Sequence, residues 1–466
     1  MSEEAELQER LRAVPSVQRL LEEPALRAVE ATLGREAVLG AVRQILESVR
    51  LALREGAAQA PPAAELAERA AARARARLAG GVRRAINATG VILHTGLGRA
   101  VLCEAARRDI AAELGGYCNV ELNLETGERG ERDLFVAGLL TQVLGCEAAT
   151  VVNNNAAATM LILAALAKGK EVIVSRGQLI EIGGSFRIPD VMAMSGAKLV
   201  EVGTTNRTHL RDYERAITPE TALLLLVHTS NYRIIGFTKE VEPRELAALG
   251  KHHGIPVVHD VGSGNLLPGL ADELRAEPSV TESLDAGVDL LCFSGDKILG
   301  GPQSGVIVGR KDLVQKVRKH PLWRALRLDK LILRALESTV ALYLDPERRG
   351  QTVPTLLMLR RPLGELEAAA AALAERLKRA APALEIETAA DSSRLGSGSL
   401  PERDIPTRVV RMRHPRLSPD ELAEKMRLSR PPIFGRIQDD WVLLDPRTLQ
   451  AGEAEEIVQG FAAMKL

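Results

Sequence analysis

Short apolar runs alternate with longer amphipathic segments between about residues 85 and 345. Strands that alternate with helices predict βαβ units, and so an α/β fold with a mostly parallel sheet covered on both faces. The strand-like runs are AATVVN (148–153), EVIVSRG (171–177), AKLVEVG (197–203), ALLLLVHTS (222–230), IPVVHD (255–260) and VDLLCFS (288–294), and helical stretches between them include 156–169 and 243–254. Ligands bind beyond the carboxyl ends of parallel strands, so the polar residues that end these runs are candidates for chemistry.

The two ends of the chain follow other patterns. Residues 1–84 are rich in Ala, Leu, Glu and Arg with apolar positions at helical spacing, which predicts a helical N-terminal domain. Residues 346–466 combine a long helical stretch at 363–382 with strand-like runs at 407–413 and 439–445, which predicts a small α+β domain. We therefore expect three domains, at 1–84, 85–345 and 346–466.

Composition excludes several classes of protein. Lys plus Arg and Asp plus Glu both number 61, so no overall field attracts nucleic acid or a membrane. The four cysteines form no C-x-x-C pair and no cluster with histidine at metal-ligand spacing, so we expect no metal site. There is no signal-like apolar segment near the start and no run of roughly 18 apolar residues, so we expect a cytoplasmic protein.

One local charge feature stands out within the helical region. Six arginines follow Glu68 with no intervening acid: Arg69, Arg73, Arg75, Arg77, Arg83 and Arg84. Such a run is typical of a solvated helix face, and it is also suited to contacts with phosphate groups. The pattern alone leaves both interpretations open.

Two charged residues end neighbouring apolar runs. Asp260 ends IPVVHD, and Lys297 follows LLCFSGD. At the same edge of one parallel sheet, the lysine can form a Schiff base with an aldehyde cofactor, and the acid can hold a protonated pyridine nitrogen. The alternative is that the two are unrelated surface charges.

A helix start supplies a third element. The strand-like run at 149–152 gives way to Asn153, Asn154 and Asn155 and then to a helical stretch. Backbone N–H groups and the positive end of the dipole at such a start bind phosphate, although ordinary N-capping explains one asparagine equally well. Ser294 adds a hydroxyl near the same place. Together with the polar strand end HTSNY, these elements match the layout of fold-type I pyridoxal-phosphate enzymes.

Seven segments carry a more specific resemblance. They are INATGVILHTGLGRA, VVNNNAAATMLIL, SRGQLIEIGGSFRIPDVM, HTSNYRIIGFT, HDVGSG, FSGDKILGGPQSG and HPLWRALRLDK. Together they resemble the bacterial selenocysteine synthases, the L-seryl-tRNA(Sec) selenium transferases, over nearly the whole chain. SGDKILGGPQ alone is shared with relatives that act on small amino acids, whereas the N-terminal region and HPLWRALR indicate the transferase family.

The resemblance implies an aspartate aminotransferase-like fold of type I, pyridoxal 5′-phosphate as cofactor, and a reaction. Seryl-tRNA(Sec) would displace Lys297 from the cofactor, and Lys297 would then remove the α-proton while Asp260 keeps the pyridinium protonated. Loss of the β-hydroxyl leaves a dehydroalanyl ester, to which selenium from selenophosphate adds to give selenocysteinyl-tRNA(Sec). The remaining expected cofactor contacts are Asn154, Asn155, Ala156 and Ser294 at the phosphate and Asn231 at the ring hydroxyl.

Selenophosphate requires an anion site. Arg99 in GLGRA, with Arg324 and Arg327 in WRALR, resembles the family's anion-binding arginines. The spacing of Arg324 and Arg327 predicts a shared helix face, although salt bridges to nearby acids are an alternative role. Asp296 either assists proton transfer or holds a loop. Three histidines can be structural or catalytic; the structural interpretation is favoured, so they are left out of the expected site: His94, His228 and His259.

The resemblance also implies partners. It assigns the N-terminal domain to tRNA binding and the whole chain to a homo-oligomer, a ring of dimers that forms a decamer. Two competing hypotheses remain. A pyridoxal-phosphate lyase acting on a free amino acid or amino-sugar acid needs an arginine for the free carboxylate, for which Arg436 is the candidate. A tRNA-binding protein with a degenerate site is the other.

Overall fold

The computed structural model divides the chain into two compact units, Met1–Arg84 and Ala85–Leu466. It describes residues 3–464 and Leu466, except 57–58, 79–80, 183–185, 233, 271, 275–276, 346–349 and 398–403. The boundary expected after residue 345 adjoins 346–349 and so lies outside the described residues. Within the described ranges, no helix is both long enough and apolar enough to cross a membrane.

The first unit is helical. α4 places Val38, Val42 and Val49 at helical spacing on one buried face, and the alanines of α5 pack closely against it. Arg69, Arg73 and Arg75 lie on the exposed side of α5. The helices are α1 (Glu3–Arg12), α2 (Val17–Leu21), α3 (Pro24–Leu33), α4 (Arg35–Arg54) and α5 (Ala63–Leu78).

The second unit is built on a seven-stranded sheet with the order β2-β10-β9-β8-β7-β3-β6. Its strands are β2 (Ala148–Val152), β3 (Glu171–Ser175), β6 (Lys198–Val202), β7 (Thr221–Val227), β8 (Val257–Gly262), β9 (Leu290–Ser294) and β10 (Gly305–Gly309). β10 is antiparallel to β2 and β9, and the other neighbours are parallel. The predicted mostly parallel sheet is confirmed, whereas β10 was not among the predicted strands.

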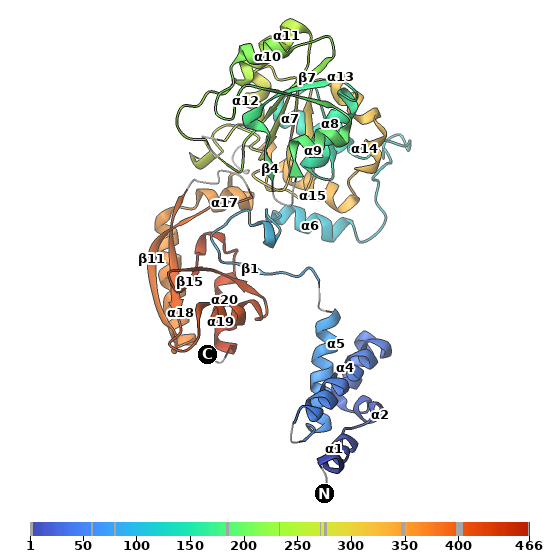
Figure 1. Cartoon of the computed structure of the whole chain (residues 1–466), viewed down its shortest axis with the longest axis vertical. Helices are drawn as coiled ribbons and strands as arrows, with labels where there is room; N and C mark the ends of the chain where they lie inside the picture. The colour runs from blue at the N-terminus through green and yellow to red at the C-terminus, as the bar shows by residue number, and fades with distance from the viewer. Residues whose placement is uncertain are drawn as a thin grey trace. The chain divides into compact units, whose positions relative to one another are not determined.

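Helices cover both faces of this sheet, as predicted. α8 (Asn155–Leu166), α9 (Ile188–Ser195) and α13 (Lys311–Lys319) share one core with Val172 and Val174 of β3. Ile173 points the other way, because successive strand residues alternate between faces. Figure 1 shows α8 and α9 side by side over the sheet. The other core includes α7 (Leu134–Leu144), α10 (Leu210–Ala216), α11 (Pro243–His253), α12 (Val280–Asp285), α15 (Lys330–Ala341) and α17 (Pro354–Arg360).

Two short helices and a small hairpin complete this part of the unit. α6 (Glu104–Glu113) packs on α15, and α14 (Pro321–Ala325) follows α13 directly. β4 (Glu181–Ile182) pairs with β5 (Phe186–Arg187) between β3 and α9.

The C-terminal part forms a second, antiparallel sheet with the order β11-β12-β15-β14. Its strands are β11 (Glu385–Ser393), β12 (Ile405–Arg413), β14 (Arg436–Gln438) and β15 (Trp441–Leu444), and the helices α18 (Leu363–Ala380), α19 (Pro419–Arg427) and α20 (Glu453–Ala463) contribute to its core. β1 (Ile86–Asn87) pairs in parallel with β13 (Ile433–Phe434). The segment that leads to Arg99 is therefore anchored in the C-terminal core.

Candidate active site

A cavity of about 240 Å³ lies at the carboxyl ends of β7, β8 and β9. Eight of the predicted site residues line it: Arg99, Asn154, Asn155, Ala156, Asp260, Ser294, Asp296 and Lys297. The fold thus brings together side chains that are far apart in the sequence, at the edge where the strand ends predicted a site.

Asp260 is held by two side-chain donors. Asn155 Nδ2 donates to its Oδ1 at 2.8 Å, and Thr159 Oγ1 donates to its Oδ2 at 2.9 Å. Burial raises the pKa of Asp260, while these two hydrogen bonds and the charge of Lys297 act in the opposite direction. The carboxylate of Asp260 is therefore held in one orientation, which suits an acid that pairs with one nitrogen of a bound ring.

Lys297 is almost completely buried in the same cavity, with 6% of its surface exposed. Burial lowers its pKa, the nearby charge of Asp260 opposes that shift, and the charge of Arg99 adds to it. A lowered pKa increases the share of neutral amine, the form that attacks an aldehyde or removes a proton. The burial of Lys297 rules out the alternative of an unrelated surface charge.

The start of α8 closes one side of the cavity. Asn154 is the N-cap, and its side chain accepts a hydrogen bond from the backbone N–H of Ala157 at 2.8 Å. In the described part of the chain, the backbone N–H groups of Asn155 and Ala156 have no hydrogen-bond partner. The side-chain amide of Asn155 is directed to Asp260, so its available contribution to an anion is its backbone N–H.

Arg99 and Asp296 form an ion pair at the cavity. Arg99 Nη1 donates to Asp296 Oδ2 at 2.8 Å, and the backbone N–H of Ala100 donates to the carbonyl oxygen of Asp296 at 3.3 Å. Arg99 has a left-handed backbone with a φ of 61°, which is uncommon for a residue other than glycine. Its buried Nε has no partner among the described residues, so part of the guanidinium is free to bind an anion.

Three predicted residues do not line the cavity. Asn231 donates through Nδ2 to the carbonyl oxygen of Glu181 at 2.5 Å. Arg324 and Arg327 are exposed, and α14 ends at Ala325. The prediction of a shared helix face for the two arginines is therefore wrong, because Arg327 lies beyond the end of the helix.

The sequence interpretation missed several residues at the site. Thr159 lies four residues after Asn155, on the same face of α8, and this spacing was the signal that could have identified it. His228 lines the cavity although it was interpreted as structural. His259 does have a structural environment: burial lowers its pKa to about 3, and its Nδ1 lies 3.2 Å from Ser283 Oγ.

Arg436, the candidate for a free carboxylate, is engaged elsewhere. It donates to the carbonyl oxygen of Thr89 at 2.5 Å and to Asp391 Oδ2 at 2.7 Å, and it lies 3.4 Å from Asp445 Oδ2. It does not line the cavity that contains Lys297. These contacts join the segment after β1 to the C-terminal sheet.

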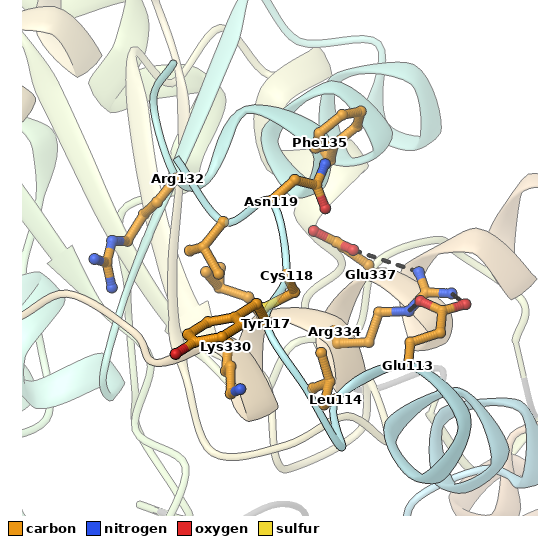
Figure 2. Close-up of a pocket in the computed structure, with 12 residues that line it drawn as sticks. Glu113, Leu114, Tyr117, Cys118, Asn119, Arg132, Phe135, Lys330, Arg334 and Glu337 are labelled. Carbon is orange, nitrogen blue, oxygen red and sulfur yellow. Dashed lines mark hydrogen bonds and ion pairs between the residues drawn. The ribbon is translucent and has the colours of Figure 1, made fainter. Parts of the chain in front are cut away.

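A second cavity, of about 400 Å³, lies between α6, the segment that follows it and α15. Figure 2 shows Arg334 within this cavity, paired with Glu113 and Glu337. Tyr117 and Phe135 at its edge are exposed. The residues around the two cavities do not overlap, so the second is separate from the Lys297 site.

Comparison with known proteins agrees with this geometry. A family model described as "L-seryl-tRNA selenium transferase" matches residues 85–450, and one described as "Selenocysteine synthase N terminal" matches residues 11–50. The L-seryl-tRNA(Sec) selenium transferase of Desulfomicrobium baculatum is 48% identical over 95% of this chain and 96% of its own length. That of Moorella thermoacetica is 46% identical over 96% of both.

A solved structure is similar in fold. D-glucosaminate-6-phosphate ammonia-lyase superimposes with a TM-score of 0.55 at 19% identity, covering 84% of this chain and 97% of the other. The fold is the predicted aspartate aminotransferase-like fold of type I. With the family model matching most of the chain and relatives near half identity, this protein belongs to the L-seryl-tRNA(Sec) selenium transferase family.

Proposed function

We propose that this chain converts L-seryl-tRNA(Sec) to L-selenocysteinyl-tRNA(Sec), by β-elimination of the serine hydroxyl and addition of selenium from selenophosphate. The observation that carries the proposal is the meeting of Lys297 and Asp260 in one buried cavity, in a chain of this family. The reaction supplies selenocysteine for protein synthesis, which places the enzyme in the cytoplasm with the other tRNA-dependent steps.

The cofactor is pyridoxal 5′-phosphate, and the residues present fit it. The unpaired backbone N–H groups of Asn155 and Ala156 suit its phosphate, with Asn154 as the cap and Ser294 as a further hydroxyl. Lys297 would hold its aldehyde carbon and Asp260 its ring nitrogen. When bound, it provides a conjugated ring that accepts the electrons of the α-carbon. Asn231 stays a candidate for the ring hydroxyl through its Oδ1, which has no hydrogen-bond partner among the described residues, while its Nδ2 donates to the carbonyl oxygen of Glu181.

Lys297 and Asp260 would have different roles: Lys297 would act on the α-proton of the substrate, and Asp260 on the proton of the ring nitrogen. The Nζ of Lys297 removes the α-proton of the seryl group, helped by the lowered pKa that favours its neutral form. Asp260, oriented by Asn155 and Thr159, would hold the ring nitrogen in its protonated form. Both side chains are buried, so charges that develop beside them are screened less than in bulk water.

Selenophosphate is proposed to bind at Arg99. Its guanidinium borders the cavity and has an unpaired Nε, while Asp296 fixes its orientation. Arg324 and Arg327 are proposed as further anion contacts. Their support is the hydrogen bond from the backbone N–H of Asn153 to the carbonyl oxygen of Leu326, which holds their segment against the residue before the α8 cap.

The helical first unit is proposed to bind the tRNA. Arg69, Arg73 and Arg75 are exposed on α5, where they can contact phosphates of a folded RNA by shape and charge. Arg73 Nε also donates to Gln44 Oε1 at 2.8 Å, which restrains its side chain. The side chain of Arg77 lies outside the described residues.

The active form is proposed to be a homo-oligomer built of dimers, a ring of ten chains as the family resemblance implies. Exposed apolar side chains gather around the second cavity, and Figure 2 shows Tyr117 and Phe135 at its edge. Leu122 and Leu124, in the segment after α6, and Leu134, the first residue of α7, are also exposed. A surface of this kind is typical of a protein–protein interface. Light scattering would test the mass against multiples of the 50.3 kDa chain.

The competing lyase hypothesis is tested by substrate choice. It needs an arginine for a free α-carboxylate, and the candidate Arg436 is already paired with Asp391. The purified protein is supplied with selenophosphate and either seryl-tRNA(Sec) or free L-serine. We expect turnover of the seryl-tRNA alone, whereas turnover of free serine alone would favour the lyase.

A further inference from the structure

His228 places an imidazole at the Lys297 cavity with a buried carboxylate beside it. It follows β7, and its backbone N–H donates to the carbonyl oxygen of Asp260 at 2.9 Å. Its Nε2 lies 3.4 Å from Oε1 of Glu277, whose side chain is 1% exposed. Glu277 belongs to the loop before α12, and its carbonyl oxygen accepts a hydrogen bond from Asn265 Nδ2 at 3.1 Å.

The buried side chain of Glu277 requires a hydrogen-bond partner, because a buried polar group without one is costly. Its Oε1 accepts no hydrogen bond within the described part of the chain, and His228 Nε2 lies 3.4 Å from it. The 3.4 Å separation is longer than a hydrogen bond, as catalytic contacts often are before substrate binds. An imidazole whose Nε2 lies on the Glu277 side has its Nδ1 left for a second partner.

The other titratable side chains at the cavity already have a partner or a proposed role. Asp260 accepts hydrogen bonds from Asn155 and Thr159. Asp296 is paired with Arg99, and Lys297 is the proposed base. His228 is therefore the group left to supply a proton to the departing hydroxyl.

We propose that His228, oriented by Glu277, is the general acid of the elimination. This rests on the proposed function. Lys297 Nζ takes the α-proton, and the electron pair of that C–H bond forms the double bond between Cα and Cβ. The Cβ–O bond breaks, and its electron pair takes a proton from the His228 imidazolium, so the hydroxyl leaves as water. Glu277 is a positioning residue that acts through the ring.

The leaving group provides the test. The full-length enzyme loaded with cofactor is given tRNA(Sec) carrying either serine or β-chloroalanine, because chloride leaves without a proton. His228→Gln is expected to slow elimination from seryl-tRNA by about 100-fold or more, the scale of general acid catalysis, while chloroalanyl-tRNA reacts at the parent rate. Glu277→Gln is expected to show a smaller loss with the same selectivity. His252→Gln, at an exposed histidine on α11, is the matched control.

A second readout separates this role from a structural one. The equilibrium affinity of the apoprotein for pyridoxal 5′-phosphate and the absorbance of the bound cofactor are expected to be unchanged in both variants. Equal slowing on the two substrates, a loss of cofactor affinity, or parent rates on both would overturn the assignment to His228. A parent enzyme that acts on neither acylated tRNA would instead refute the proposed function itself, and the inference with it.

Discussion

Replacing Gly305 with alanine tests whether the start of α8 holds the cofactor's phosphate. Gly305 is the first residue of β10, where it pairs with Val152 of β2 and Ser294 of β9. A Cβ at this position would lie 2.5 Å from the carbonyl carbon of Asn154 and 3.0 Å from the backbone nitrogen of Asn155. Carbon atoms prefer a separation of about 3.5–4.0 Å, so one of the two segments has to move by about 1 Å.

The helix start is the segment expected to yield, because β10 is held on both sides by the sheet. A displacement of about 1 Å at a positioning element costs roughly 100-fold in function. We therefore expect the dissociation constant of pyridoxal 5′-phosphate to rise about 100-fold, or about 2.7 kcal/mol. Titration of the apoprotein, followed by the absorbance of the bound cofactor, measures this directly.

Gly364→Ala is the matched control, because Gly364 is exposed on α18 and a Cβ there meets no atom within 4 Å. It is expected to bind the cofactor like the parent. Circular dichroism and gel filtration establish that the Gly305 variant is folded. A folded Gly305→Ala protein with parent affinity would refute the reasoning and move the phosphate site away from the α8 start.

Three further predictions follow from the same structure. Lys297→Ala should abolish the absorbance band of the lysine-linked cofactor, and an unchanged spectrum would contradict the assignment of that lysine. Deletion of residues 1–80 should abolish tRNA(Sec) binding in a filter assay while cofactor binding survives, and equal tRNA affinity would contradict the role of the helical unit. Arg436→Met should lower the free energy of unfolding by about 2 kcal/mol, measured by thermal melting, because Asp391 and the buried Asp445 each lose a charged partner; the KM for seryl-tRNA(Sec) should stay unchanged.

The sheet could be predicted because its strands are short apolar runs with polar ends. Each run from AATVVN to VDLLCFS forms a strand, and Asp260 and Lys297 meet because parallel strands end at one edge. β10 was missed because GVIVG follows a glycine-rich turn without a helix between it and β9, so the alternation gave no sign of it. The antiparallel direction of β10 could not be predicted from its own residues, because it depends on how β10 inserts between β2 and β9.

Side-chain directions could not be predicted in the same way. The asparagine run predicted a helix start, but whether the Asn155 amide faces a phosphate or Asp260 depends on packing between α8 and β8. Arg324 and Arg327 do not share a helix face because α14 ends at Ala325, between them. A helix end without a glycine or proline stop is poorly marked in sequence. Glu277 lies in a loop without any periodic pattern, so nothing in the sequence paired it with His228.

Transfer of labelled selenium tests the central claim most directly. Purified protein is incubated with seryl-tRNA(Sec) and [75Se]selenophosphate, and the amino acid released from the recovered tRNA is identified. The account predicts labelled selenocysteine with the parent protein and none with Lys297→Ala. Unlabelled serine recovered from the parent reaction, or labelled product from the Lys297 variant, would contradict it.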